Sequence, residues 1–167
     1  MFLDECGVNT DMTRRYARSK SNERAADSMP VNTPCSTTIL SSIRLNGQTA
    51  YTVYRGGTTA EQFAEYLKRI LIPALSKDDI IVMDNMRSHH AKTVKNFLDA
   101  SGIRYLYLPP YSPDFNPIEK MWSKIKAYLR KVKVRLTTEL PNAIDNAFLT
   151  VCPSDCSGWF SSCYFVR

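Results

Sequence analysis

The feature that most constrains the fold is a run of four apolar residues, Ile80 to Met83, that stops abruptly at Asp84. A short run that is apolar at every position is typical of a parallel strand covered on both faces. Helical spacing of apolar residues follows over residues 92–101, and a second strand pattern covers residues 103–108. Parallel strands joined through a helix need a right-handed crossover, so the chain is predicted to be α/β.

Antiparallel strands are predicted nearer the start of the chain. Residues 2–5 have the composition of the end of a strand. Two β-prone runs, 37–45 and 48–54, flank Asn46 and Gly47, and this dipeptide is a strong hairpin signal because both turn residues tolerate positive φ. The predicted sheet is therefore mixed, with helices on both faces.

The polar stretch over residues 7–34 is predicted to be a long loop with at most one short strand. The helix after the hairpin is predicted to be capped by Thr58 or Thr59. Glu61 or Gln62 would then complete a capping box.

A longer helix is predicted over residues 118–134, because Asn116 is a favoured N-cap residue and Pro117 a favoured first residue. Two more helices are predicted over residues 138–151 and 155–165.

Composition indicates one domain with a real core, since the 167 residues are 44% apolar and 23% charged. The chain lacks a run of about 18 apolar residues, and its start lacks the features of a secretory signal. Five cysteines without an export signal are expected to be free thiols in a reducing cytoplasm. A zinc site at the three C-terminal cysteines lacks a nearby fourth ligand, so a plain helix is favoured there.

Three carboxylates are candidates for a common site, because chemistry in open α/β sheets lies at strand ends. Asp4 and Asp84 are at or near the ends of predicted strands, and Glu119 is in the first turn of the long helix. Such a cluster repels itself unless a cation such as Mg2+ or Mn2+ lies within it. Two plainer interpretations stay open at this point: Asp84 as a turn residue, and Glu119 as the capping-box partner of Asn116.

The segment from Leu108 to Glu119 reads L-P-P-Y-S-P-D-F-N-P-I-E. It resembles the signature of DDE transposases of the mariner-like superfamily, and more narrowly that of the bacterial insertion-sequence branch. The second block of that family, V-x-D-N-x-x-x-H, is similar to the residues from Val82 to His89, and the first block, F-x-D-E, to those from Phe2 to Glu5. The 34 residues between Asp84 and Glu119 match the spacing of this branch.

The resemblance implies a ribonuclease-H-like fold, a five-stranded mixed sheet flanked by helices, with C-terminal helices. It also implies that Asp4, Asp84 and Glu119 hold two Mg2+ or Mn2+ ions that promote DNA end cleavage and strand transfer. Asn85 and His89 are expected either to support these ligands or to contact DNA. Glu5 is expected to face away from Asp4, because strand side chains alternate.

The basic residues of the chain are concentrated in the long helix. Residues 117–135 contain seven Lys or Arg and one acid, which accounts for the whole net charge of +6. On a helical wheel, Lys126 and Arg130 lie near Glu119, whereas Lys120 and Lys124 lie on the solvent side. Given the resemblance, all four are candidates for contacts with DNA phosphates, and the alternative is a solvated helix face.

Full transposases of this kind carry an N-terminal helix-turn-helix region, and none is expected within residues 1–167. Residues 1–167 are therefore expected to be a single catalytic domain whose first strand is truncated. Its expected partners are double-stranded DNA (transposon ends and target), a separate helix-turn-helix segment and a second copy in an active homodimer. No membrane contact is expected, and the expected location is cytoplasmic, at the nucleoid. Two other hypotheses are an inactive remnant that binds DNA nonspecifically, and a ribonuclease-H-like nuclease without transposition activity.

Overall fold

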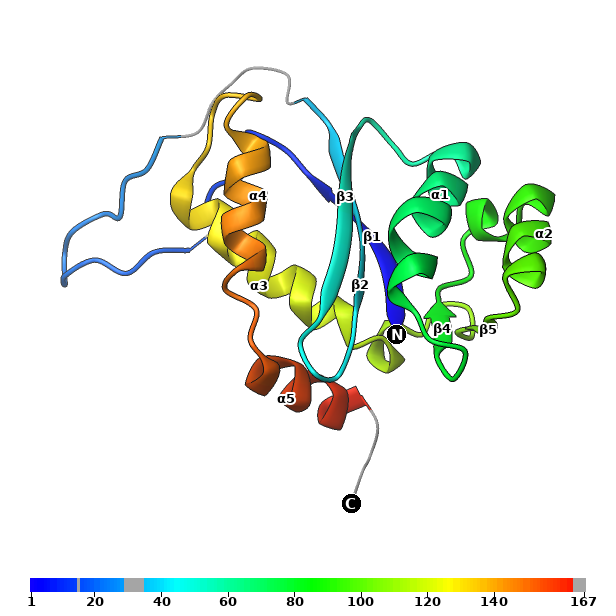
Figure 1. Cartoon of the computed structure of the whole chain (residues 1–167). Coiled ribbons are helices and arrows are strands. Elements are labelled where there is room, and N and C mark those ends of the chain that lie inside the picture. The colour runs from blue at the N-terminus through cyan, green and yellow to red at the C-terminus, as the bar shows by residue number, and fades with distance from the viewer. Residues whose placement is uncertain (15, 29–34, 164–167) are drawn as a thin grey trace.

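The computed structural model describes residues 1–14, 16–28 and 35–163, which form a five-stranded mixed sheet with helices on both faces (Figure 1). The strands are β1 (Phe2–Val8), β2 (Thr37–Ile43), β3 (Thr49–Arg55), β4 (Ile80–Met83) and β5 (Arg104–Tyr107). Their order in the sheet is β3-β2-β1-β4-β5. The first three strands pair antiparallel, while β1, β4 and β5 pair parallel, as predicted.

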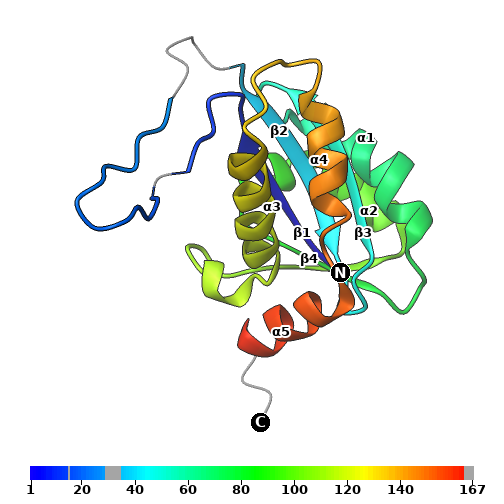
Figure 2. The same ribbon diagram turned by 90° about the vertical axis from the view of Figure 1, so that its left-hand side faces the viewer.

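The helices lie in two layers that sandwich the sheet (Figures 1 and 2). One layer holds α1 (Ala60–Tyr66), which continues through a π-helical turn at Leu67–Leu71, and α2 (Lys92–Ser101). The other holds α3 (Ile118–Val132), α4 (Leu140–Phe148) and α5 (Pro153–Cys163). Short 3-10 turns occur at Ile72–Ala74, Arg87–His90 and Pro113–Phe115. None of the helices in the described residues combines the length and hydropathy that crossing a lipid bilayer requires.

Alternation along β1 divides the core into two clusters. Phe2, Cys6 and Val8 belong to the cluster beneath α3 and α4, whereas Leu3 belongs to the cluster beneath α1 and α2. The period of two places Asp4 on the α3 side and Glu5 on the α1 side. The central strand thus presents two neighbouring carboxylates to opposite layers.

Most predicted elements are confirmed. The helix over residues 92–101 has the predicted bounds and ends at Gly102, which is left-handed with a φ of 70°. Thr59 is the cap of α1, and Gln62 completes its capping box. The helix at the end of the chain begins at Pro153, slightly earlier than predicted, and its last two predicted residues lie outside the described part.

Three expectations about local structure were wrong. The first strand extends to Val8, so Asp4 lies in its middle and not near its end, because Cys6 and Val8 continue the inward alternation across exposed Gly7. The hairpin turn also differs from the prediction, because only Gly47 has a positive φ (89°) and Asn46 does not. The backbone N–H of Arg44 donates to the Gln48 carbonyl, and the loop between the paired strands spans five residues, 44–48.

The third correction concerns Asn116, whose side chain makes no capping hydrogen bond at the start of α3. Its backbone carbonyl still accepts the Glu119 N–H at 3.2 Å, but its amide is turned toward β1. Residues 7 and 8 of the predicted loop belong to β1, and its other described residues, 9–14 and 16–28, contain neither helix nor strand. The remainder of that predicted loop lies outside the described residues.

Candidate active site

Asp4 is held by three hydrogen bonds in the middle of β1, where only 6% of the residue is exposed. Its Oδ1 accepts the backbone N–H of Glu5 at 2.7 Å. Its Oδ2 accepts the indole N–H of Trp122 at 3.2 Å and the side-chain amide of Asn116 at 3.4 Å. The last two donors both come from α3 or the residue pair before it, so this helix orients the carboxylate.

Asp84 follows β4 directly and is held by His89. The Nδ1 atom of His89 lies 2.8 Å from Oδ1 of Asp84, and the backbone N–H of Met86 donates to the same oxygen at 3.2 Å. Burial alone would raise the pKa of Asp84, but the hydrogen bond and charge of His89 outweigh it and lower that pKa. Asp84 is therefore ionised at neutral pH.

His89 is fully buried and bridges two carboxylates from different strands. Its ring stacks on Phe63 with centroids 4.2 Å apart, and its Nε2 atom lies 3.5 Å from Oε1 of Glu5. Burial would lower its pKa, yet the close contacts with the Asp84 and Glu5 carboxylates raise that pKa to about 9. The imidazolium therefore compensates the charges of Asp84 and of Glu5, whose side chain is only 9% exposed. Asn85, the neighbour of Asp84, contacts the ring of His90.

Glu119 lies in the first turn of α3 and is exposed. The loop before it is shaped by Tyr111, which has a φ of 56° and a fully exposed side chain, and by Ser112, whose hydroxyl donates to the Pro110 carbonyl at 3.3 Å. Because Asn116 points to Asp4 and forms no cap, Glu119 is not the partner of a capping box. The Glu119 carboxylate instead lines a cavity that it shares with Asp4 and Asp84.

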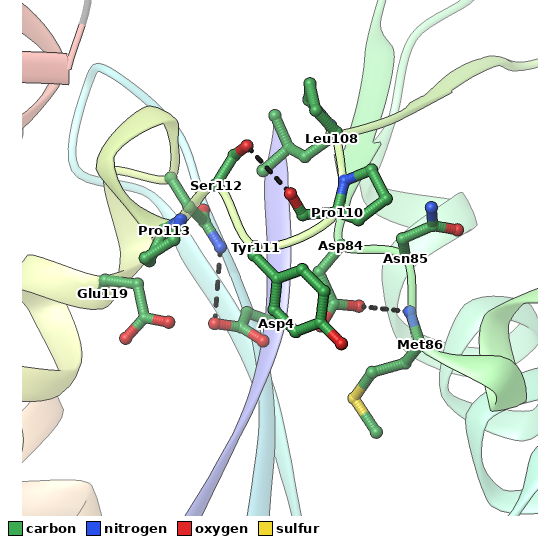
Figure 3. A pocket seen from close by; sticks show the side chains of 12 residues that line it. Asp4, Asp84, Asn85, Met86, Leu108, Pro110, Tyr111, Ser112, Pro113 and Glu119 are labelled. Atoms are coloured by element: carbon green, nitrogen blue, oxygen red, sulfur yellow. Dashed lines mark hydrogen bonds between the residues drawn. The ribbon is translucent and has the colours of Figure 1, made fainter.

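The three carboxylates line one cavity of about 480 Å3. Figure 3 shows them arriving from β1, from the end of β4 and from the start of α3. The remaining wall is made by the loop between β5 and α3, together with two residues after β4: Asn85, Met86, Leu108, Pro109, Pro110, Tyr111, Ser112, Pro113 and Asn116.

The cavity brings the like charges of Asp84 and Glu119 near Asp4. Burial is the largest cause that raises the pKa of Asp4 to about 7, and the like charges of Glu119 and Asp84 raise it further. Oxygen ligands of this kind suit Mg2+ and Mn2+ chemically. Among the described residues, however, no three Asp, Glu, His or Cys side chains stand close enough together to hold a metal ion. A shared cation would therefore require the carboxylates to approach one another.

A family model for the DDE superfamily endonucleases matches residues 1–140. The chain belongs to this family. No curated protein sequence matches the chain. The narrower assignment to the bacterial insertion-sequence branch stays a prediction.

This DDE endonuclease chain is similar in structure to the mariner transposase Mos1. A Mos1 paired-end complex with the left transposon end has 18% identity and a TM-score of 0.76, and the match covers 95% of this chain and 50% of that one. The Mos1 catalytic domain has 17% identity and a TM-score of 0.69, with 95% and 74% covered. The chain thus spans about half the length of the Mos1 chains in such complexes.

Likeness at this identity shows the fold, a five-stranded mixed sheet with flanking helices of the ribonuclease-H-like type, as predicted. Other Mos1 structures are described as a paired-end complex with Mg and a paired-end complex with Mn.

The basic residues of α3 divide into two groups in this DDE endonuclease. Lys124 pairs with Asp155 of α5, and Lys133 pairs with Asp27. By contrast, Lys126 and Arg130 make no ion pair within the part of the chain that the structure describes, and together they line a polar hollow of about 410 Å3 beyond the end of β1.

Lys120 is exposed on the outer side of α3. Of the four predicted DNA contacts, Lys124 is thus already engaged inside the protein.

Sequence reasoning missed the contacts that support the carboxylates. Trp122 lies among the buried apolar residues of α3, and this position predicts packing and not the hydrogen bond that its N–H donates to Asp4. A signal existed, because Trp122 lies three residues after Glu119 and so shares its helix face. The link from Glu5 to His89 depends on sheet geometry, and no local pattern predicts it.

Proposed function

We propose that this chain is the catalytic domain of a DNA transposase, which cleaves DNA at transposon ends and transfers the resulting 3′ ends into target DNA. The observation that carries the proposal is the meeting of Asp4, Asp84 and Glu119 at one cavity in a chain of the DDE endonuclease family. The likeness to Mos1 complexes with transposon DNA supports the substrate class.

Asp4, Asp84 and Glu119 are the residues that would hold divalent cations, which we propose to be two Mg2+ or Mn2+ ions. When bound, such ions activate a water or a 3′-hydroxyl and stabilise the leaving oxygen of a phosphodiester. The protein's own part is to aim the carboxylates. His89 holds Asp84, while Trp122 and Asn116 hold Asp4.

In the cleavage step, water attacks phosphorus and the bond to the 3′-oxygen breaks, which leaves a 3′-hydroxyl. In the transfer step, that hydroxyl attacks a target phosphodiester and a new bond forms as an old one breaks. Lys126 and Arg130, and more distantly Lys120 and Lys124, are the proposed phosphate contacts. We also propose that the active form is a homodimer and that a helix-turn-helix segment supplies recognition of the transposon ends.

The experiment is a nicking and joining assay on a labelled duplex that carries the ends of the element encoding this chain. With Mg2+ or Mn2+ the unchanged chain should nick the duplex, and a pre-cut 3′ end should join to a plasmid. Asp84→Asn and Glu119→Gln should each lower both rates by more than about 100-fold, since even outer-shell partners of a metal cost 10- to 100-fold.

Glu65→Gln is the matched control, because Glu65 is an exposed acid of α1 paired only with Arg69. It should keep the unchanged rate. Activity that persists in the Asp84 and Glu119 variants would rule out the carboxylate mechanism. Nicking without joining would favour a nuclease over a transposase. Absence of nicking in the unchanged chain, even with the helix-turn-helix segment supplied, would favour an inactive remnant.

A further inference from the structure

We propose that the polar hollow beyond the end of β1 reads one base of the bound DNA. Lys126 and Arg130 hold a phosphate there, while Asn9 and Asp11 accept a hydrogen bond from the amino group of an adenine or a cytosine. The proposal deepens the proposed function and rests on it, because it assumes that the chain binds DNA. It adds a base preference, which phosphate contacts by themselves do not provide.

The first wall of the hollow is positively charged. Lys126 and Arg130 come from α3, are partly buried and pair with no acid among the described residues. The thiol of Cys6 lies beside Lys126, but burial raises the pKa of that thiol to about 11. The thiol is therefore neutral and does not offset the charge of Lys126. This wall suits a phosphate group.

The second wall supplies hydrogen-bond acceptors. It consists of the end of β1 and the loop that follows, with the lining residues Gly7, Asn9, Asp11, Met12 and Thr13. The Oδ1 atom of Asn9 is buried and has no hydrogen-bond partner among the described residues. A buried acceptor without a donor is unfavourable, so Asn9 favours a ligand that brings an N–H group. The carboxylate of Asp11 is a second acceptor in the same wall.

This pairing of charges and acceptors selects among the four bases. In the major groove, adenine and cytosine each present an amino group, whereas guanine and thymine present acceptors at the corresponding place. Asparagine commonly binds adenine there, and a carboxylate accepts from cytosine. A wall that carries Asn9 and Asp11 therefore favours adenine or cytosine and disfavours the other two bases.

The loop that carries both acceptors is anchored at its two ends. Asn9 follows directly after β1, which pairs with β2 over all of its residues. Arg135 then donates from its Nη1 atom to the carbonyls of Thr10 and Met12, at 2.8 Å and 3.1 Å. Asn9 and Asp11 are thus presented by a held segment, and a held side chain discriminates between ligands better than a mobile one.

The hollow lies beside the carboxylate cavity along both elements that form it. Gly7 is three residues beyond Asp4 on β1, a rise of about 10 Å. Lys126 is seven residues beyond Glu119 on α3, which is also about 10 Å. Successive phosphates of one DNA strand advance by about 3.4 Å along the duplex axis. The base in the hollow is therefore expected about three base pairs from the phosphate at the cavity.

The test is a binding selection with the full chain, in EDTA so that no cleavage occurs. The ligand is a pool of duplexes that finish at a pre-cut end of the element encoding this chain, with the last six or so base pairs randomised. Sequencing the bound and unbound fractions gives the preference at each position. We expect one position, about three base pairs from the end, to favour adenine or cytosine on one strand by about 5-fold or more.

Two variants of Asn9 and a matched control separate base reading from other effects. Asn9→Ala should remove most of the preference and leave the salt dependence of binding unchanged, because Asn9 neutralises no phosphate. Asn9→Asp retains the acceptor oxygen and should retain the preference. Asn96→Ala, at an exposed asparagine of α2, should behave like the unchanged chain. A preference that survives Asn9→Ala undiminished would overturn the proposal.

A second measurement needs no variant of the protein, so it holds where Asn9→Ala fails to fold. The preferred base is replaced by its analogue without the amino group, purine for adenine or 2-pyrimidinone for cytosine. Binding of the unchanged chain should weaken by about 5-fold or more at that position and stay the same for replacements elsewhere. An equal loss at every position would contradict a single reading site.

The two proposals fail in different ways. Absence of binding to any duplex would overturn both. Binding and joining of DNA without a base preference at any of the randomised positions would overturn only the role of the hollow.

Discussion

At the scale of single residues, Asp4 is an acid whose burial works against stability. It is 6% exposed, and burial with the nearby charges of Glu119 and Asp84 raises its pKa to about 7. A cation in the cavity would relieve this repulsion, and without one the ionised carboxylate destabilises the fold. Active-site groups commonly carry such a cost.

The sign of the resulting pH dependence follows from linkage. Because the pKa of Asp4 is about 7 in the folded chain and about 3.9 in the unfolded chain, the folded state binds more protons between these values. Its contribution to stability is therefore full below about pH 4 and is lost as the pH rises to 7.

We expect Asp4→Asn, in EDTA, to be more stable than the unchanged chain at pH 8 by about 1 kcal/mol or more. The difference should shrink toward pH 4, and urea unfolding across this range measures it. Asp78→Asn, at an exposed acid, is the control and should show no such trend. Equal stability at pH 8 would contradict the buried-charge argument.

The candidate site was predictable at this scale only where a residue type and its spacing carry the signal. Asp84 stands where an apolar run stops, and Glu119 stands in the motif before a helix, so the sequence marks both as candidates, and both line the cavity. The donor role of Trp122 was hidden, because its position in an apolar stripe predicts burial and not a hydrogen bond. His89 was predicted to support the ligands, but its contact with Glu5 arises from two strands that are distant in sequence.

At the scale of elements, α3 unites the functions proposed here. It carries Glu119 in its first turn, Trp122 one turn on, and then Lys126 and Arg130 along the same side. Its bounds were predicted well because its apolar stripe is strong. The first strand was predicted too short because the polar stretch from residue 7 onward predicts a loop, whereas the alternation of Cys6 and Val8 continues the strand.

The hairpin turn offers a prediction at this scale, because it meets the start of α5. Gly47 has a φ of 89°, and a Cβ atom there would lie 3.2 Å from the backbone of Pro153. We expect Gly47→Ala to lower the free energy of unfolding by about 1–3 kcal/mol, through strain in the turn and a contact with rigid backbone.

Gly57→Ala is the matched control for the turn. Gly57 follows the second strand of the same hairpin, and a Cβ atom there would meet nothing within 4 Å. Denaturant unfolding should show little change for it. A Gly47→Ala protein as stable as the control would mean that the turn and α5 separate without cost.

At the scale of the whole molecule, charge and fold are arranged around one helix. The net charge of +6 equals the excess of basic residues within residues 117–135. Part of that charge has partners within the protein, since Lys124 and Lys133 form ion pairs with acids. Arg135 also donates to the Thr10 and Met12 carbonyls, at 2.8 Å and 3.1 Å. The sequence shows the excess of basic residues, but only the fold shows which of these side chains already have partners within the protein.

Salt dependence distinguishes these two groups of cations. Binding to DNA phosphates releases counterions, so the slope of log K against log salt counts the phosphates that are neutralised. Because Lys126 and Arg130 make no ion pair within the described residues, the double variant Lys126→Gln, Arg130→Gln should reduce that slope by about 2 and weaken binding to all duplexes alike.

Lys133→Gln is the matched control and should reduce thermal stability slightly while leaving the slope unchanged, because Asp27 already holds Lys133. Fluorescence anisotropy with one labelled duplex between 50 and 200 mM salt measures both. If the double variant kept the original slope, the DNA path would have to run over another face, and the charge of α3 would be no more than a solvated helix surface.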